Sequence, residues 1–171
     1  TGLVCGWAYS SPPLRLQSRG FGEFAITLAW FCIVIGSDYV QTQTLNPTAL
    51  YAGLAYAPLV ANVLFINQIP DRVADAAVGK DTLIVCYGPY IAAWGSLLCY
   101  MISATTLLLG IAQGALPNWT LLSLAATIPA TMALRALMTN AVDPRQLGRA
   151  IPATIISALL FGTLLATGLM V

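Results

Sequence analysis

Hydrophobic residues gather into five long stretches that are separated by short polar segments. The stretches run approximately over Gly22–Gln41, Pro47–Asn67, Pro89–Ala112, Pro117–Met138 and Pro152–Val171. Each is close to the roughly 20 helical residues that are needed to cross the ~30 Å hydrocarbon core of a bilayer. No strand-like alternation, internal repeat or low-complexity tract competes with this pattern. The sequence therefore predicts an all-α fold, a polytopic transmembrane helical bundle with about five complete spans.

Proline marks the start of four of these five stretches. A helix tolerates proline in its first turn, because the missing N–H would have no partner there. Asn46 precedes Pro47 as an expected N-cap, whereas Pro58 and Pro129 lie inside their stretches and are expected to kink them. The opening residues Thr1–Ala8 resemble the tail of an apolar helix.

The positive charges all fall on one side of the predicted bundle. Two of the four turns between spans contain no Lys or Arg. The two other turns and the segment before the first span hold six of the seven cations: Arg15, Arg19, Arg72, Lys80, Arg145 and Arg149. The seventh, Arg135, lies in the fourth span near that same end. Because Lys and Arg are retained on the cytoplasmic side, these loops are expected to face the cytoplasm. The protein is thus predicted to be a multi-pass protein of the inner or plasma membrane.

Composition excludes several other classes of function. Hydrophobic residues make up 58% of the chain and charged residues 8%, and the mean hydropathy is +0.82, so lipid must solvate much of the surface. A net charge of +1 without a basic cluster excludes nucleic acid as a partner. The absence of histidine excludes Ser-His-Asp and Cys-His catalysis within these residues. The cysteines lack CxxC spacing, which disfavours a zinc or haem site: Cys5, Cys32, Cys86 and Cys99.

The polar segment after the second stretch has a different character, because residues 67–83 hold three of the six acidic residues. Pro70 is expected to begin a short helix there and Gly79 to end it. On such a helix Asn67, Asp71 and Asp75 have i, i+4, i+8 spacing and share one face.

Two carboxylates and an amide on one face provide oxygen ligands of the kind that suits Mg²⁺, which takes one or two carboxylates together with phosphate oxygens. Lys80, just after the glycine, could turn back toward a phosphate. The alternative is an ordinary solvated loop, since the DxxxD spacing alone is a weak pattern. Neighbouring carboxylates repel one another unless they are neutralised, which favours the metal site. Elsewhere Asp38 is interpreted as a residue at the membrane boundary, and Asn62 as an interhelical hydrogen-bonding group.

The run NQIPDRVADAAVGKDTLIVCYG resembles the second aspartate-rich motif of UbiA-type prenyltransferases. It matches at Asn67, Asp71, Asp75, Gly79, Lys80, Thr82 and Leu83. The segment YSSPPLRLQSRGFGE resembles the loop that precedes the fifth helix of these enzymes, with matches at Tyr9, Pro12, Pro13, Arg15, Arg19, Gly20 and Glu23. The stretch Tyr39-Val40-Gln41-Thr42 resembles the dihydroxynaphthoate polyprenyltransferases of menaquinone synthesis.

The resemblance implies a nine-helix fold in which residues 1–171 are the C-terminal part of a single domain. The first aspartate-rich motif would then lie upstream, and the chain alone is expected to be inactive. The implied reaction is Mg²⁺-dependent transfer of a prenyl group from a polyprenyl diphosphate to an aromatic acceptor, 1,4-dihydroxy-2-naphthoate, in contact with membrane lipid. Homogentisate, chlorophyllide, haem or a glycerol phosphate as acceptor remains an alternative, as does a non-catalytic membrane subunit or carrier.

The resemblance also implies roles for individual residues. Asp71 and Asp75 would be catalytic and, with Asn67, would bind the metal. Lys80, Arg15 and Arg19 would bind the diphosphate. Aromatic faces would shield the prenyl carbocation, and the candidates for this role are Tyr9, Trp30, Tyr39 and Tyr56.

Overall fold

The computed structural model describes residues 2–171, apart from the side chain of Cys5. Its elements, in chain order, are α1 (Gly2–Ser10), η1 (Leu16–Ser18), α2 (Gly22–Thr42), α3 (Pro47–Ala77), α4 (Leu83–Tyr87), α5 (Ile91–Ala112), η2 (Asn118–Ala126), α6 (Thr127–Asn140) and α7 (Pro144–Met170). These residues contain helices and no strands, which confirms the all-α prediction. The helical tail predicted over Thr1–Ala8 is present from Gly2 onward, and Thr1 lies outside the described residues.

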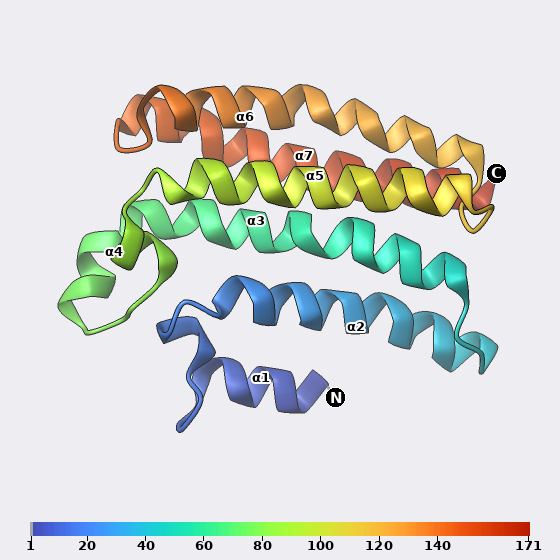
Figure 1. Cartoon of the computed structure of the whole chain (residues 1–171), viewed down its shortest axis with the longest axis horizontal. Helices are drawn as coiled ribbons and strands as arrows, with labels where there is room; N and C mark the ends of the chain where they lie inside the picture. The colour runs from blue at the N-terminus through green and yellow to red at the C-terminus, as the bar shows by residue number, and fades with distance from the viewer. Residues whose placement is uncertain (1) are drawn as a thin grey trace.

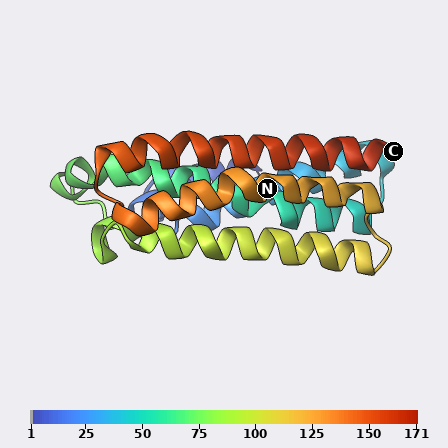
Figure 2. The same ribbon diagram turned by 90° about the horizontal axis from the view of Figure 1, so that it is seen from above.

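The long helices lie side by side in an up-and-down bundle (Figure 1). The central helix is α3, which packs against α2, α5 and α7. Seen from above, α7 and α5 lie on opposite sides of the bundle (Figure 2). Five segments are long and apolar enough to cross a membrane: Gly22–Thr42, Pro47–Ala77, Ile91–Ala112, Asn118–Asn140 and Pro144–Met170. The predicted number of spans is therefore confirmed.

Several predicted boundaries are wrong. The second span does not stop before a separate short helix at Pro70, because α3 continues through Pro58 and Pro70 to Ala77. A proline removes one backbone donor, and a packed membrane bundle can compensate for that loss. The last helix begins at Pro144, eight residues before Pro152, because Asp143 caps it by accepting a hydrogen bond from the Arg145 N–H at 2.9 Å.

The fourth span is a 3₁₀-helix over Asn118–Ala126 that continues as an α-helix from Thr127. The interior proline that was expected to kink it, Pro129, lies two residues after this change of helix type. The backbone of η2 runs close against α7, because a Cβ at Gly168 would lie only 2.8 Å from the Thr120 backbone. A tight 3₁₀ segment and a glycine therefore let the two backbones approach.

The turn between α2 and α3 also differs from the prediction in its capping. Asn46 occupies the N-cap position of α3, but its side chain makes no capping hydrogen bond. Its Nδ2 donates instead to Oδ2 of Asp38 at 2.7 Å. Asp38 lies at this loop end of α2, as expected for a boundary residue.

Two clusters of buried residues form the core. One lies near the motif end of the bundle around Phe65, Ile84 and Leu137, and the other around Leu59 and Phe161. Between α3 and α5 the Ser96 hydroxyl donates to Oδ1 of Asn62 at 2.7 Å, which confirms the predicted interhelical hydrogen bond. Large apolar side chains such as Trp94, Leu98 and Leu159 are more than half exposed, as lipid-facing residues should be.

Candidate active site

The candidate site begins at the C-terminal end of α3, which extends past the rest of the bundle (Figure 1). Gly79 adopts a positive φ of 72°, its N–H donates to the Ala76 carbonyl at 3.1 Å, and the Lys80 N–H donates to the Asp75 carbonyl at 3.0 Å. This pair of hydrogen bonds is the Schellman motif, in which a left-handed glycine ends the helix. The sequence therefore predicted the end of the motif helix correctly, and the turn directs Lys80 back over the last turn of α3.

Lys80 meets Asp75 as a result of this turn. Its Nζ lies 2.7 Å from Oδ1 of Asp75. The hydrogen bond to Asp75, with further attraction from the carboxylates of Asp75 and Asp71, raises the pKa of Lys80, and partial desolvation opposes the rise. The ammonium group thus stands over the acidic face and remains charged at neutral pH.

Asn67, Asp71 and Asp75 lie on one continuous helix, so their i, i+4, i+8 spacing places them along one face, as predicted. The Asn67 and Asp71 side chains are exposed, and that of Asp75 is partly covered by Lys80. Within residues 2–171 the Asp71 carboxylate has no hydrogen-bonding or salt-bridge partner.

Residues 2–171 contain no group of three His, Cys, Asp or Glu side chains that could hold a metal ion by themselves. Two carboxylates and an amide fit a hard divalent cation that takes its remaining ligands from water and from phosphate oxygens.

The arginine-bearing loop between α1 and α2 contacts the end of the motif. The Asp81 N–H donates to the Ser18 carbonyl at 2.9 Å. A Cβ at Gly20 would lie 3.4 Å from the Asp81 carbonyl oxygen. Arg15 and Arg19 are carried on this loop with exposed side chains, at the same end of the bundle as the acidic face. The structure thus brings together the two sequence segments that carry the predicted site residues.

After Lys80 the chain is anchored by α4. The Thr82 hydroxyl caps this short helix by accepting from the Val85 N–H at 3.3 Å, and the Ile84 side chain is fully buried in the core. The motif loop is therefore fixed to the bundle at both of its ends.

Sequence reasoning assigned no role to a second polar group beside this face. Gln68 donates from Nε2 to Oε1 of Glu23 at 2.7 Å, joining α3 to the first turn of α2. Burial raises the pKa of Tyr9, the nearby Glu23 carboxylate raises it further, and Lys80 lowers it. The sequence feature that could have indicated this group is Glu23, an acidic residue in the first turn of an apolar span, where it complements the helix dipole.

The aromatic candidates separate into two groups. Tyr9 lies within electrostatic range of Lys80 and Glu23. Tyr56 is 15 residues before Asp71 on α3, which corresponds to about 22 Å along the helix, and Trp30 packs edge-on against it. Tyr39 lies still farther along, near the opposite end of α2. Of these four, Tyr9 is the one near the motif lysine, and a role for it in shielding a carbocation stays a prediction.

The stretch Tyr39–Thr42 ends α2 at the loop opposite the motif (Figure 1). There the Gln41 side chain donates to the Ser37 carbonyl of its own helix at 3.0 Å. The stretch therefore does not contact the acidic face.

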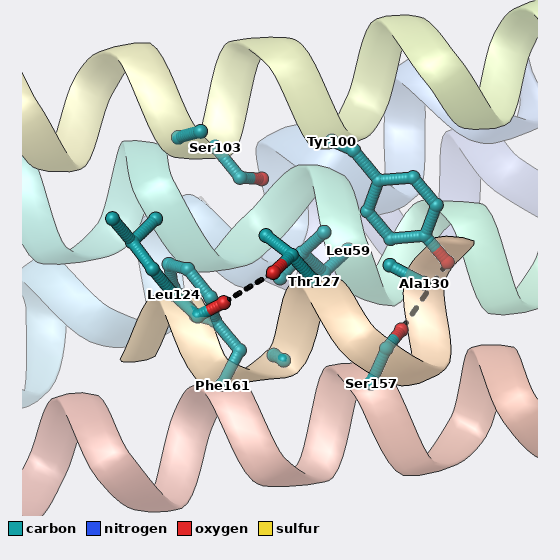
Figure 3. Close-up of a pocket in the computed structure, with 10 residues that line it drawn as sticks. Leu59, Tyr100, Ser103, Leu124, Thr127, Ala130, Ser157 and Phe161 are labelled. Atoms are coloured by element: carbon teal, nitrogen blue, oxygen red, sulfur yellow. Dashed lines mark hydrogen bonds between the residues drawn. The ribbon is translucent and has the colours of Figure 1, made fainter. Parts of the chain in front are cut away.

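A small cavity lies between α3, α5, η2, α6 and α7, with Tyr100 and Ser103 at its wall (Figure 3). The Tyr100 hydroxyl and the Ser157 Oγ are 3.2 Å apart. The cavity volume of about 30 Å³ holds no more than about two water molecules. It is therefore too small to be a substrate site.

The fold and the acidic face together define an integral membrane helical protein with an oxygen-rich polar site at one end. The chain belongs to the UbiA prenyltransferase family, whose sequence profile matches residues 1–151.

Among curated proteins, the chain is 23% identical over 171 residues to 1,4-dihydroxy-2-naphthoate octaprenyltransferase of Bacillus subtilis, covering 99% of this chain and 55% of that protein. It is 27% identical over 94 residues to the chloroplastic chlorophyll synthase of Arabidopsis thaliana, covering 54% of this chain and 24% of that protein. A third relative is the Arabidopsis 2-carboxy-1,4-naphthoquinone phytyltransferase, 26% identical over 110 residues, which cover 57% of this chain and 29% of that protein. The chain thus spans about a quarter to about half of the length of these relatives. No solved structure matches it significantly.

Proposed function

We propose that this protein transfers a prenyl group from a polyprenyl diphosphate to an aromatic acceptor within the membrane. We also propose that residues 1–171 form the C-terminal part of a single UbiA-type domain. The observation that carries the proposal is the acidic face at the end of α3, with Lys80 turned back over it by the Schellman motif. The family match supports the reaction class.

In this proposal Asp71 and Asp75, with Asn67, hold Mg²⁺ at the diphosphate, and the metal supplies positive charge that makes the diphosphate a better leaving group. Lys80 is already charged and lies at this face, so it can exchange its contact with Asp75 for a diphosphate oxygen. Arg15 and Arg19 lie on the neighbouring loop and add positive charge. As the allylic C–O bond breaks, these groups stabilise the charge that grows on the departing diphosphate.

The proposed acceptor is 1,4-dihydroxy-2-naphthoate. Support comes from the GKDTL ending of the motif and from the Bacillus relative, which aligns along almost the whole chain. The YVQT stretch supports the acceptor only as a sequence resemblance, because it lies at the far end of α2. Chlorophyllide is a second candidate, since the chlorophyll synthase of Arabidopsis also aligns with this chain.

The test uses the complete protein in proteoliposomes with one prenyl diphosphate and a panel of aromatic acceptors. We expect transfer to 1,4-dihydroxy-2-naphthoate that needs Mg²⁺ and stops when EDTA is added. Preference for chlorophyllide, 4-hydroxybenzoate or homogentisate would overturn the proposed acceptor. Absence of any transfer, with the protein folded and Mg²⁺ present, would overturn the proposed reaction.

A further inference from the structure

One face of α3 leads from the acidic motif into the membrane. Tyr56, Val60, Leu64, Asn67 and Asp71 follow one another at intervals of four, four, three and four residues, which places them on the same side of the helix. The three apolar members of this row are neither fully buried nor fully exposed. The row thus connects the proposed diphosphate site to an apolar surface inside the bilayer.

This face is crossed by aromatic rings at the level of Tyr56. Trp30 of α2 packs edge-on against Tyr56, with ring centroids 6.1 Å apart and an interplanar angle of 84°. On its other side the Tyr56 ring fills the space above Gly162 of α7, where an added Cβ would lie 2.7 Å from the ring. Among the described residues, α2 and α7 each pack against α3 but not against each other. The two rings and Gly162 therefore close the gap between α2 and α7.

A groove of about 550 Å³ lies between α2, α3 and α7. Tyr56 and Gly162 line it at the level of the ring pair, and most of its other lining residues, such as Val34, Leu165 and Met170, lie on the side remote from the motif. Its lining is mainly apolar, including Val34, Leu159 and Leu165, and contains no charged side chain. Such a surface suits a hydrocarbon chain, because apolar contacts dominate it.

The distance along α3 from Asp71 to the Trp30–Tyr56 pair corresponds to a definite length of prenyl chain. Asp71 lies about 22 Å from Tyr56 along the helix. Four chain bonds of about 1.5 Å each give an extended isoprene unit a length of about 5 Å. About four units therefore reach from the diphosphate site to the Tyr56 ring.

We propose that the Trp30–Tyr56 pair sets the length of the prenyl chain that the protein uses, an inference that rests on the proposed prenyl transfer. A chain of up to about four isoprene units ends at the pair. A longer chain reaches the groove beyond only by displacing the Tyr56 ring.

The test compares prenyl diphosphates of three, four and eight units on the complete protein in proteoliposomes. Tyr56→Ala and Trp30→Ala are each expected to raise the ratio of kcat/KM for eight units to that for three units by at least about tenfold, within the range that apolar pocket contacts give. Tyr56→Phe keeps the ring and should retain the wild-type ratio. Trp119→Ala is the matched control, because this tryptophan is 58% exposed on η2, away from the crossing.

The measured quantity is a ratio of two kcat/KM values for the same variant. A loss of folded protein lowers both values equally and leaves the ratio unchanged. An unchanged ratio in both alanine variants, or an equal change in Trp119→Ala, would overturn the inference while prenyl transfer itself stands. A wild-type protein that transfers none of the three chains would instead overturn the proposed function.

Discussion

At the scale of single residues, the two carboxylates of the motif are in different states. Asp75 is paired with Lys80 at 2.7 Å, whereas Asp71 is exposed and has no such partner among the described residues. The repulsion expected between carboxylates one turn apart is thus relieved at Asp75 by a lysine. Asp71 remains available to a cation or another positive group.

The first prediction concerns these two aspartates. Asp71→Ala and Asp75→Ala in the complete protein should each lower the rate of prenyl transfer by about 10²–10³, the usual cost of one charge-stabilising contact. Asp71→Asn should be nearly as damaging, because the amide keeps the shape and loses the charge. Transfer is measured with saturating Mg²⁺, alongside thermal unfolding.

The controls are Asp81→Ala and Asp143→Ala, whose carboxylates lie outside the acidic face. These two variants should lose much less activity. The free energy of unfolding of Asp71→Ala should change by no more than about 0.5 kcal/mol, as is usual for an exposed side chain. Full activity in both Asp71→Ala and Asp75→Ala would mean that the segment is only a solvated loop.

The second prediction concerns Lys80. Because its pKa is raised by Asp75, the ion pair stabilises the fold fully below the usual lysine value of about 10.4 and is lost only as pH rises through the higher folded value. Lys80→Met should therefore destabilise the protein by about 0.2–1 kcal/mol, equally at pH 7 and pH 9. Thermal unfolding of both proteins at the two pH values measures this. A destabilisation that disappears between pH 7 and pH 9 would contradict the assignment.

The residues of the acidic face could be predicted from sequence, since a helix fixes which positions share a side. The contact between Glu23 and Gln68 could not, because it depends on how α2 and α3 pack against each other. The same holds for the Trp30–Tyr56 pair, which joins residues of different helices. Short-range spacing was thus sufficient for the motif and insufficient for its surroundings.

At the scale of helices, close packing of α5 on α3 depends on one glycine. A Cβ at Gly95 would lie 1.9 Å from Cε1 of Phe65, and the Phe65 side chain is itself 97% buried, being only 3% exposed. The ring therefore occupies the place where a larger residue would stand. The third prediction is that Gly95→Ala destabilises the bundle by about 1–3 kcal/mol through overpacking.

Gly36→Ala is the matched control for this change. Gly36 lies inside α2, and no atom of another element lies within 4 Å of an added Cβ. Alanine should then stabilise the helix by up to about 1 kcal/mol through its higher helix propensity. Unfolding in detergent is measured for both variants. If Gly95→Ala leaves the free energy of unfolding unchanged, Phe65 can move aside at little cost.

The helix boundaries show what a hydrophobic pattern can and cannot determine. The ends of α2 and α5 were predicted to within two residues, because apolar character stops where the helix stops. The start of α3 at Pro47 was also predicted, but the C-terminal end of that span and the start of α7 were not, because these helices continue into polar sequence beyond the apolar stretch. Proline was read as a helix start at Pro70 and Pro152, where the structure places it inside a helix.

At the scale of the whole molecule, the helix lengths place the acidic face outside the hydrocarbon. The 31 residues of α3 have a length of about 46 Å, compared with a hydrocarbon core of about 30 Å. The excess lies at the end that carries Asp71 and Asp75, since Pro47 begins directly after the opposite turn. A charged diphosphate can therefore remain in the polar region while an attached apolar chain enters the membrane.

The last prediction is the orientation of this bundle in the membrane. The structure places the loop before α2, the loop after α3 and the turn between α6 and α7 at one end (Figure 1). The loops before α2 and after α3 carry Arg15, Arg19 and Lys80. The other four cations lie in the helix turns next to this end, at the end of α3, the end of α6 and the start of α7: Arg72, Arg135, Arg145 and Arg149. Because Lys and Arg in short loops are kept on the cytoplasmic side, this end should face the cytoplasm and the turns at Asn46 and Asn118 should face the opposite side.

Single-cysteine labelling with a membrane-impermeant reagent measures this orientation, in a protein whose four native cysteines are replaced. Ala76→Cys and Gly148→Cys add exposed positions at the charged end, and Thr44→Cys and Asn118→Cys add exposed positions at the other. In intact cells only the second pair should react, and after permeabilisation all four should. Reaction of Ala76→Cys and Thr44→Cys from the same side would exclude a membrane-spanning α3. Reaction of only the first pair in intact cells would reverse the orientation, and would place the proposed diphosphate site outside the cytoplasm.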